Sequence, residues 1–193
     1  MFETTLQIQK HEGVTVLRLH SDDGTNRLTS ACIAALTETL CRLSHGTGGL
    51  VIAGNRKFFS TGAELSEIRA LTAAAAYDFA QLGQRLMTAI AEFPAPVFAA
   101  ISGYCMGGGL DLALACRRRI AAPNAIFGHR GAALGLITGW GGTQRLSRLI
   151  GKAQALEMFI AAEKINASTA LRLGLIDAIA EDPVAEASRR LQR

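Results

Sequence analysis

Apolar residues occur along the chain in two patterns, and each pattern predicts one kind of element. In the first, apolar and β-branched residues alternate with polar ones or form short uninterrupted runs, as they do in buried strands. The turn-forming sequence SDDGTN follows the first such segment. This pattern predicts strands at residues 13–20, 50–53, 97–101, 119–122 and 175–179.

In the second pattern, apolar residues recur every three or four positions, as on the buried face of a helix. Ile33, Leu36 and Leu40 show this spacing. Thr29 or Ser30 can cap the start of that helix. The pattern predicts helices at residues 29–44, 72–92, from 110 onward, 143–149, 153–162, 168–173 and 183–192.

Strand and helix segments alternate along the whole chain. This alternation implies an α/β fold with mainly parallel strand pairing. No fixed sequence period and no low-complexity linker divides the chain. Because 193 residues are enough to bury one sizeable core, we expect a single domain over residues 1–193.

The charge of the chain is moderately basic, with a formal net charge of +4. Arginines occupy residues 117–119 consecutively, and Arg189, Arg190 and Arg193 lie near the C-terminus. No aromatic residues alternate with these arginines, and no nucleic-acid motif accompanies them. We therefore expect a solvated face or an anionic small ligand, and no nucleic-acid partner.

The cysteines and the first residues of the chain favour the cytoplasm. Cys32, Cys41, Cys105 and Cys116 lack metal-type spacing, and residues 1–10 lack the pattern of a secretory leader. Polar residues or glycines interrupt every long apolar stretch, so we expect no membrane span and no membrane partner. Reduced thiols in a cytoplasmic protein are the simplest interpretation.

Two glycine loops each lead from a strand into a helix, at residues 59–65 (FSTGAEL) and 101–112 (ISGYCMGGGLDL). Gly62 would allow a tight turn before one helix. The glycines at 107–109 would allow a ligand to approach the backbone at the start of the other. Each loop alone is an ordinary helix start, but two of them at this separation predict a shared site.

A third glycine-rich stretch lies at residues 127–146. The three motifs in this order resemble the signatures of the crotonase (enoyl-CoA hydratase/isomerase) superfamily. Residues 161–179 resemble the segment that follows these signatures in the family. The similarity therefore covers nearly the whole chain, from the first strand to about Ile179.

The resemblance implies a crotonase-type (ClpP/crotonase-like) spiral of ββα units that binds an acyl-CoA thioester. The family stabilises an enolate oxygen with two backbone amides, which here would be those of Ala63 and Gly108. It also implies homotrimers or homohexamers, and no metal or redox cofactor, since coenzyme A enters as part of the substrate. The residues expected to bind substrate or CoA are Asn26, Thr61, Gly62, Leu65, Arg130 and Trp140.

Two positions depart from the family pattern. The hydratases of the family hold a water molecule with two glutamates, and the matching positions here carry Asp111 and Gly131. Asp111 is our first candidate for moving a proton, and His129 can assist near neutral pH. Arg130 could bind a substrate carboxylate in a bidentate manner. The predicted reaction is hydration or double-bond migration on an enoyl-CoA.

Each of these polar residues also has a structural interpretation. Asp111 can be a helix-start residue, and His129 can bond a loop carbonyl group. Asn26 can be a plain turn residue. We expect Glu64 to stabilise a helix N-terminus.

Two further functions stay open. Family members usually continue into C-terminal helices that cover the acyl pocket, and because this chain stops at Arg193 we expect it to lack most of that region. This feature and Gly131 favour a non-catalytic acyl-CoA-binding homologue, whereas Asp111 favours an enzyme. A peptidase of the related ClpP-like fold would use Cys105 and His129 as nucleophile and base.

Overall fold

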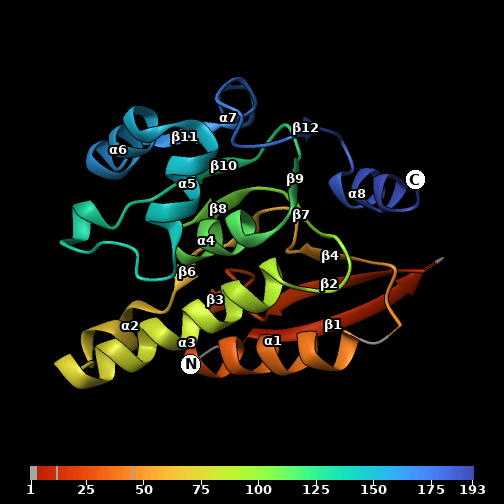
Figure 1. Cartoon of the computed structure of the whole chain (residues 1–193). Helices are drawn as coiled ribbons and strands as arrows, with labels where there is room; N and C mark the ends of the chain where they lie inside the picture. Colours follow the sequence, from red (N-terminus) through yellow and green to blue (C-terminus); the bar gives the residue numbers. More distant parts are fainter. Residues whose placement is uncertain (1–3, 12, 45) are drawn as a thin grey trace.

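A six-stranded sheet forms one side of the molecule in the computed structural model, which describes residues 4–11, 13–44 and 46–193 (Figure 1). Only β1 and β2 pair in antiparallel fashion within this sheet, and its other strands are parallel. In spatial order its strands are β1 (Thr4–His11), β2 (Val14–Ser21), β4 (Gly49–Ala53), β7 (Val97–Ile101), β9 (Arg118–Ala121) and β12 (Ala178–Ile179).

Two smaller sheets complete the strand arrangement. A four-stranded sheet has the order β11 (Lys164–Asn166), β10 (Ile126–Gly128), β8 (Tyr104–Met106) and β5 (Phe58–Ser60). A two-stranded sheet pairs β3 (Arg27–Leu28) with β6 (Gly62–Ala63). Because only the β10–β11 pair of these two sheets is antiparallel, the prediction of a mainly parallel α/β fold is confirmed.

Helices cover both faces of the six-stranded sheet, and further helices pack near the four-stranded sheet. Side chains cap several of them: Thr29 accepts a hydrogen bond from the amide of Cys32, as the sequence predicted, and Thr72 accepts one from Ala75. The helices are α1 (Ser30–Leu43), α2 (Leu65–Arg69), α3 (Ala73–Ala91), α4 (Gly108–Ala115), α5 (Gly142–Ile150), α6 (Lys152–Ala161), α7 (Ala167–Arg172) and α8 (Pro183–Leu191), with a 3-10 turn, η1, at Ala132–Leu134.

Four predicted strands lie where expected, and the fifth is shorter. Residues 175–179 were predicted as a strand, but only Ala178–Ile179 pairs with a neighbour. The apolar residues Leu175 and Ile176 are buried, at 0% and 3% exposure, but they do not pair with a neighbouring strand. The first strand, β1, was missed because it lies at the sheet edge with one face in solvent, where Ile8 is 44% exposed.

The helix predicted from residue 110 onward begins two residues earlier, at Gly108. Glycine has low helix propensity, so the sequence placed the triple glycine in the preceding loop. Close packing of this turn against β5 overrides that propensity. A methyl group on Gly109 would lie 2.7 Å from Cβ of Ser60 and 2.8 Å from its carbonyl oxygen.

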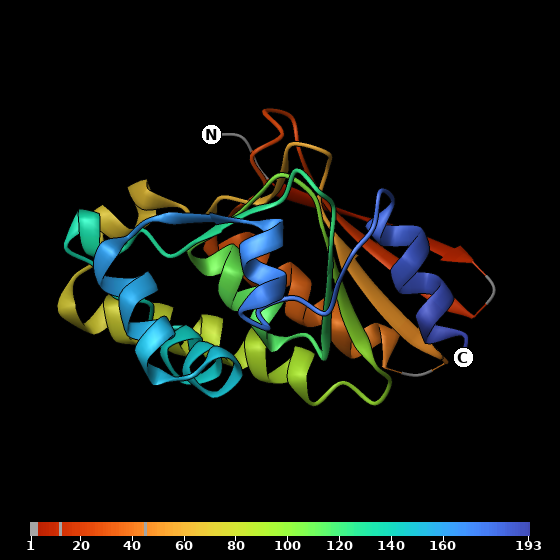
Figure 2. The same cartoon turned by 90° about the horizontal axis from the view of Figure 1, so that it is seen from above.

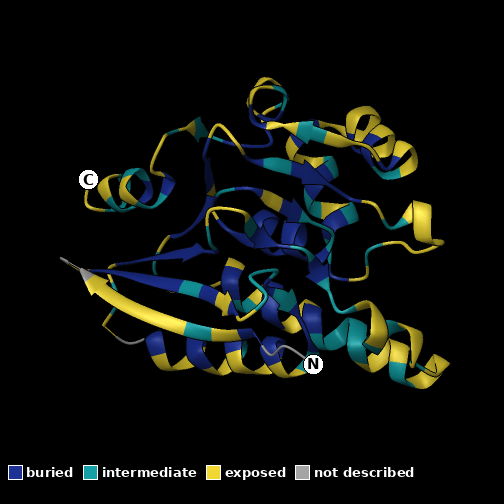
Figure 3. Ribbon diagram, turned by 180° about the vertical axis from the view of Figure 1, so that it is seen from behind, coloured by how far each residue is buried: buried dark blue, intermediate teal, exposed yellow. Residues whose placement is uncertain are grey.

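Alternating side chains of the large sheet enter two separate cores. Leu17, Leu50 and Ala99 point into the main core, which α1, α3 and α4 share. Val51 and Phe98, on the opposite face, pack with Ala187 of α8. Figure 3 shows β4 and β7 buried between these layers, and Figure 2 shows α8 at the end of the molecule away from α5 and α6.

None of the helices in the described part of the chain is long and apolar enough to cross a bilayer.

The indole ring of Trp140 fits between two helices that carry glycine at the contact. A methyl group on Gly83 of α3 would lie 2.2 Å from Cδ1 of the indole, and one on Gly108 of α4 would lie 2.3 Å from Cζ3. The Nε1 group donates to the carbonyl oxygen of Phe79 at 3.4 Å, and Trp140 is 4% exposed. The indole therefore sets the distance between α3 and the N-terminus of α4.

We predict that Gly83→Ala destabilises the fold by about 1–3 kcal/mol, because the added methyl group overpacks the indole site. Helix propensity alone predicts the opposite sign, a gain of about 0.5–1 kcal/mol. Urea unfolding followed by circular dichroism measures the difference. Gly139→Ala is the matched control, since its methyl group would make an ordinary 3.4 Å contact with Ala80. An unchanged or higher midpoint for Gly83→Ala would contradict this account of the packing.

Candidate active site

Two glycine turns bring the backbone of β6 against the start of α4. Gly62 has a φ of +93° and Gly107 a φ of +52°, conformations that disfavour L side chains. A methyl group on Gly62 would lie 2.9 Å from the amide nitrogen of Gly108, and one on Gly108 would lie 3.3 Å from the amide nitrogen of Ala63. The structure therefore brings the two amides that were predicted to hold an oxyanion side by side.

The amide of Gly108 is also suited to this role by its place in the helix. Gly108 is the first residue of α4, and the first amides of a helix have no acceptor within it. The helix dipole adds partial positive charge at the same end. An anionic oxygen placed here would therefore be stabilised by both features.

A buried polar network holds the segment that carries Ala63. Asn26 is 0% exposed, and its Nδ2 donates to the carbonyl oxygens of Phe58 and Phe59 at 3.0 and 3.2 Å. The hydroxyl of Ser60 donates to the Asn26 carbonyl at 2.7 Å and accepts from the Gly62 amide at 3.1 Å. Asn26, which was expected to bind CoA, thus has no surface for a ligand and supports the turn itself.

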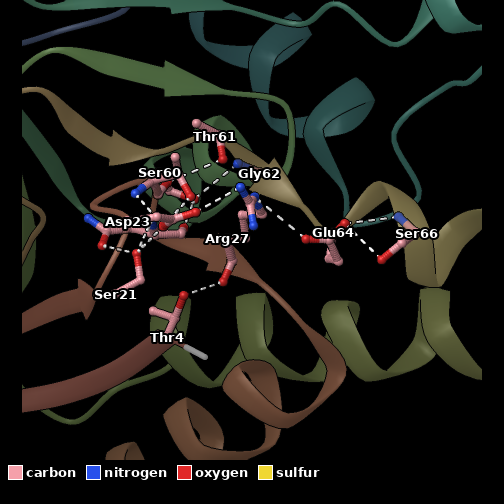
Figure 4. A network of polar contacts seen from close by, with 11 residues as sticks. Thr4, Ser21, Asp23, Arg27, Ser60, Thr61, Gly62, Glu64 and Ser66 are labelled. Atoms are coloured by element: carbon pink, nitrogen blue, oxygen red, sulfur yellow. Dashed lines mark hydrogen bonds and ion pairs between the residues drawn. The ribbon is translucent and has the colours of Figure 1, made fainter. Parts of the chain in front are cut away.

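Ion pairs tie this segment to the turn after β2 (Figure 4). Arg27 contacts Asp23 at 2.8 Å and Glu64 at 3.5 Å. Glu64 also accepts from the amide of Ser66 at 2.9 Å, so it caps α2 as the sequence predicted. The backbone amide of Ser66 is the main cause that lowers the pKa of Glu64, and the amide of Thr25 has the same effect on the pKa of Asp23.

A cavity of about 330 Å³ opens beside the two amides. It is mostly apolar, with Leu71, Phe79 and Ile137 among its lining residues. Gly62 and Asn26 do not line it. The predicted site residues that do line it are Thr61, Ala63, Leu65, Gly108, Asp111, His129, Arg130 and Trp140.

Three polar side chains meet in the cavity wall. The carboxylate of Asp111, a residue that is 1% exposed, lies with Oδ1 3.0 Å from Nε2 of His129. Its other oxygen, Oδ2, accepts a hydrogen bond from the hydroxyl of Thr138. The side chain of His129 therefore bonds the carboxylate of Asp111. The structural interpretation, in which it bonds a loop carbonyl group, is not what the structure shows. Thr138 was not predicted, because a threonine in a glycine-rich loop carries no distinguishing signal.

Helix α5 begins against this carboxylate. A methyl group on Gly142, the first residue of α5, would lie 1.9 Å from Oδ1 of Asp111. The ring of Phe159 packs against the imidazole, with its centroid 5.1 Å from that of His129. Asp111 and His129 are thus fixed by packing as well as by hydrogen bonds.

Gly131 lies where the loop backbone closes on itself. The amide of Leu136 donates to the Gly131 carbonyl at 2.8 Å. A methyl group on Gly131 would lie 2.6 Å from the Leu136 carbonyl oxygen. The position matching the second glutamate of the family therefore has no room for a side chain in this conformation.

The geometry does not support the peptidase alternative. Cys105 is 0% exposed and lies outside the cavity lining, and its thiol donates to the carbonyl oxygen of Gly109 at 3.6 Å. Burial raises the pKa of this thiol well above its usual value, which suppresses the nucleophilic thiolate. His129 is engaged with Asp111 instead. Within the part of the chain that the structure describes, no group of three or more His, Cys, Asp or Glu residues could hold a metal ion.

Comparison with known proteins identifies similar sequences. The profile of a family described as enoyl-CoA hydratase/isomerase matches residues 9–193. A Bacillus subtilis (strain 168) protein named "Probable enoyl-CoA hydratase" is 41% identical over 172 residues, which are 88% of this chain and 66% of that protein. The crotonyl-CoA hydratase of Syntrophomonas wolfei is 34% identical over 177 residues, 90% of this chain and 68% of the relative. The chain thus spans about two thirds of the length of these relatives.

Solved structures share the fold. An enoyl-CoA hydratase from Thermoplasma volcanium matches with a TM-score of 0.92 at 29% identity, over 97% of this chain and 75% of that one. Pseudomonas aeruginosa DspI matches with a TM-score of 0.90 at 31% identity, over 97% and 80% of the two chains. The fold class predicted from the resemblance is confirmed by these neighbours.

We predict that Asp23→Asn lowers stability by about 1 kcal/mol at pH 7, because an amide replaces a charged acceptor at a partly exposed site. The folded-state pKa of Asp23 is lowered, so its contribution is complete above the unfolded value near 4. It is lost as the pH falls through the folded value, and the variant and the wild type should then converge. Urea unfolding from pH 7 down to about 2.5 measures this, with Asp22→Asn as control. A difference that stays constant with pH would exclude the proposed linkage.

We also predict that Gly131→Ala costs about 1–3 kcal/mol, because the methyl group meets a carbonyl oxygen and not a flexible side chain. Thermal unfolding by calorimetry gives the shift. Ala132→Ser, an exposed change in the same loop, should stay within about 0.5 kcal/mol of wild type. Equal stability of Gly131→Ala and wild type would show that the loop opens at little cost.

Proposed function

The chain belongs to the enoyl-CoA hydratase/isomerase family, and we propose that it acts on the double bond of an enoyl-CoA thioester, by hydration or by double-bond migration. The observation that carries the proposal is the side-by-side placement of the Ala63 and Gly108 amides on a cavity that also holds Asp111 and His129. An anion-stabilising pair and an acid–base pair are the two parts that enolate chemistry needs.

The two amides would bind the thioester oxygen. In either reaction negative charge develops on this oxygen, and donors fixed in advance stabilise it without reorganisation at the moment of reaction. Loss of one such donor typically costs about 100- to 1000-fold in turnover. Because the thioester itself accepts the electrons, the proposed reaction requires no metal or redox cofactor.

The Asp111–His129 pair would move the proton. Both side chains line the cavity, whose remaining lining is mostly apolar. Arg130 is exposed at the same cavity, where its guanidinium could pair with a CoA phosphate or a substrate carboxylate. Thr61 and Leu65 lie beside Ala63 and would contact the CoA portion.

A second candidate function is acyl-CoA binding without chemistry. It is favoured by Gly131, because this position carries no carboxylate and the backbone around it leaves no space for one. Binding of CoA thioesters with no turnover of enoyl, dienoyl or carboxylated acyl-CoAs would select this function.

We propose cytoplasmic homotrimers or homohexamers as the working form. Exposed apolar residues around the cavity support association with other copies, since large apolar patches mark interaction surfaces. They include Leu134 and Ile137 of the cavity lining, at 57% and 76% exposure, and Leu156 and Ile160 of α6, at 58% and 68%. Light scattering after gel filtration measures the assembly.

We predict that Asp111→Asn lowers crotonyl-CoA turnover by about 100- to 10000-fold, the usual range for loss of acid–base function. Loss of the conjugated thioester absorbance follows hydration, and calorimetry on the same sample follows CoA binding. CoA affinity should change little, because Thr61, Leu65 and Arg130, the residues proposed to contact CoA, remain. Asp78→Asn, on the exposed face of α3, is the matched control. Unchanged turnover in an Asp111→Asn protein that binds CoA would remove Asp111 from the mechanism.

A further inference from the structure

We propose that His129 is the group that accepts and returns the proton, through Nδ1, and that Asp111 and Thr138 are positioning residues that hold its ring. This inference rests on the proposed function and assigns separate roles within its acid–base pair. In this assignment the proton is transferred by an imidazole and not by a carboxylate.

The hydrogen bonds of Asp111 leave neither of its oxygens unoccupied. Oδ1 lies 3.0 Å from Nε2 of His129, and Oδ2 accepts from the hydroxyl of Thr138. An ionised carboxylate can only accept hydrogen bonds, so Nε2 carries the ring proton. In the neutral ring Nδ1 is then the acceptor, which is the atom a general base needs.

The second ring nitrogen, Nδ1, is available for a further hydrogen bond. The hydrogen bond through Nε2 is the one that His129 makes among the described residues. Across the same residues no sealed side-chain nitrogen or oxygen lacks a partner. An unbonded Nδ1 is therefore not sealed, although His129 as a whole is 4% exposed. His129 lines two cavities, and the proposal places Nδ1 toward one of them.

His129 lies in the wall shared by two cavities. The first is the site cavity of about 330 Å³, and the second, of about 610 Å³, extends toward Phe159 and Leu156 of α6. Both cavities are lined by His129, Gly131, Leu136, Ile137 and Thr138. Because no side chain fits at Gly131, the imidazole two residues earlier is the acid–base group that bonds Asp111 at this wall. It would serve where the family pattern places the second carboxylate.

Thr138 holds the carboxylate of Asp111 in place, and this carboxylate in turn holds the ring of His129. Its hydroxyl donates to Oδ2 of Asp111 and its Oγ accepts from the amide of Trp140 at 3.4 Å. Phe159 packs against the imidazole, and α5 starts at Gly142 against Oδ1. The ring is therefore held in one orientation before substrate arrives, which lowers the cost of reaching the reactive geometry.

The proton balance closes with one base used twice. In hydration, the water oxygen bonds to C3 of the enoyl group while its proton passes to Nδ1. The electrons of the C2–C3 double bond move to the thioester oxygen, held by Ala63 and Gly108. The enolate then collapses as the His129 imidazolium returns the proton to C2. In double-bond migration, Nδ1 removes a proton from C2 and returns it to C4. Asp111 stays ionised throughout and stabilises the imidazolium.

Three charged groups contact His129 or line the cavities that it lines. Asp111 of α4 contacts it directly, Arg130 follows it in the chain at the first cavity, and Lys152 of α6 lines the second. These three groups lie on three different segments of the chain.

The test compares His129→Ala with Thr138→Val and Thr138→Ser. Two assays are used: crotonyl-CoA hydration, and exchange of the α protons of butyryl-CoA with D₂O, followed by NMR. The exchange assay needs only the base and the two amides. We expect His129→Ala to lose about 100- to 10000-fold in both, and added imidazole to restore at least part of the loss. Thr138→Val should lower kcat with little change in KM, and Thr138→Ser should recover most of it.

The pH dependence of kcat for the unmodified protein is a second test, which requires no variant. An imidazole base gives an acid limb of kcat between about pH 5 and 8, whereas a carboxylate base gives one at lower pH. His20→Ala and Thr37→Val are controls, since His20 is exposed on β2 and Thr37 of α1 bonds the Ile33 carbonyl and not Asp111. Both controls should retain the activity of wild type. Circular dichroism and CoA calorimetry confirm that each variant folds and binds.

Three outcomes would overturn the inference. An acid limb in the carboxylate range would return the base role to Asp111. A folded His129→Ala variant whose activity stays within about threefold of an active wild type would do the same, because loss of a general base lowers the rate far more than threefold. In both cases the proposed function survives. A wild type that binds CoA but catalyses neither hydration, double-bond migration nor exchange would overturn the proposed function as well, and would leave acyl-CoA binding.

Discussion

The close approach of two backbone segments, at Gly62 and Gly108, is the constraint on which the rest of the site depends. Each glycine lies where a single methyl group would meet the opposite strand or helix at about van der Waals distance or less. Glycine is required there because only a backbone without Cβ atoms can bring two amides to one point. Trp140 completes the arrangement, since its indole sets how far α4 lies from α3. The positions of the cavity and of its polar wall follow from this contact.

Charge inside the molecule is stabilised by dedicated partners. Asp111 is buried, and removing an ionised carboxylate from water is costly unless hydrogen bonds replace the lost solvation. His129 and Thr138 supply those bonds, and neither side chain could be lost without leaving part of the carboxylate unpaired. Arg119 shows the same logic away from the site: it is 5% exposed and pairs with Asp177, while its guanidinium also donates to two carbonyl oxygens. In both places, hydrogen bonds from neighbouring groups hold the buried charged side chain in a fixed position.

The site departs from the family pattern in a connected way. Where the pattern has two carboxylates, this chain has one, and the loop at Gly131 has closed so that a second cannot simply be added. An imidazole held by Asp111 and Thr138 stands next to that closed loop. One base that acts twice is chemically sufficient for hydration or double-bond migration if its ring is held in place. The glycine at position 131 and the tight packing of its loop therefore belong to one arrangement.

The sequence by itself determined the elements with strong local signals. Buried parallel strands such as β4 and β7, and helices with capping threonines such as Thr29, were predictable because apolar periodicity and caps act over a few residues. The glycine motifs identified the family and the pair of amides. Short strands such as β8 and β10 had no such signal, because they are stabilised by partners distant in sequence. Only the tertiary structure showed that Thr138 joins Asp111 and His129, and that Asn26 lies sealed beneath the loop. Long-range packing decides which side chains meet, and no local pattern records it.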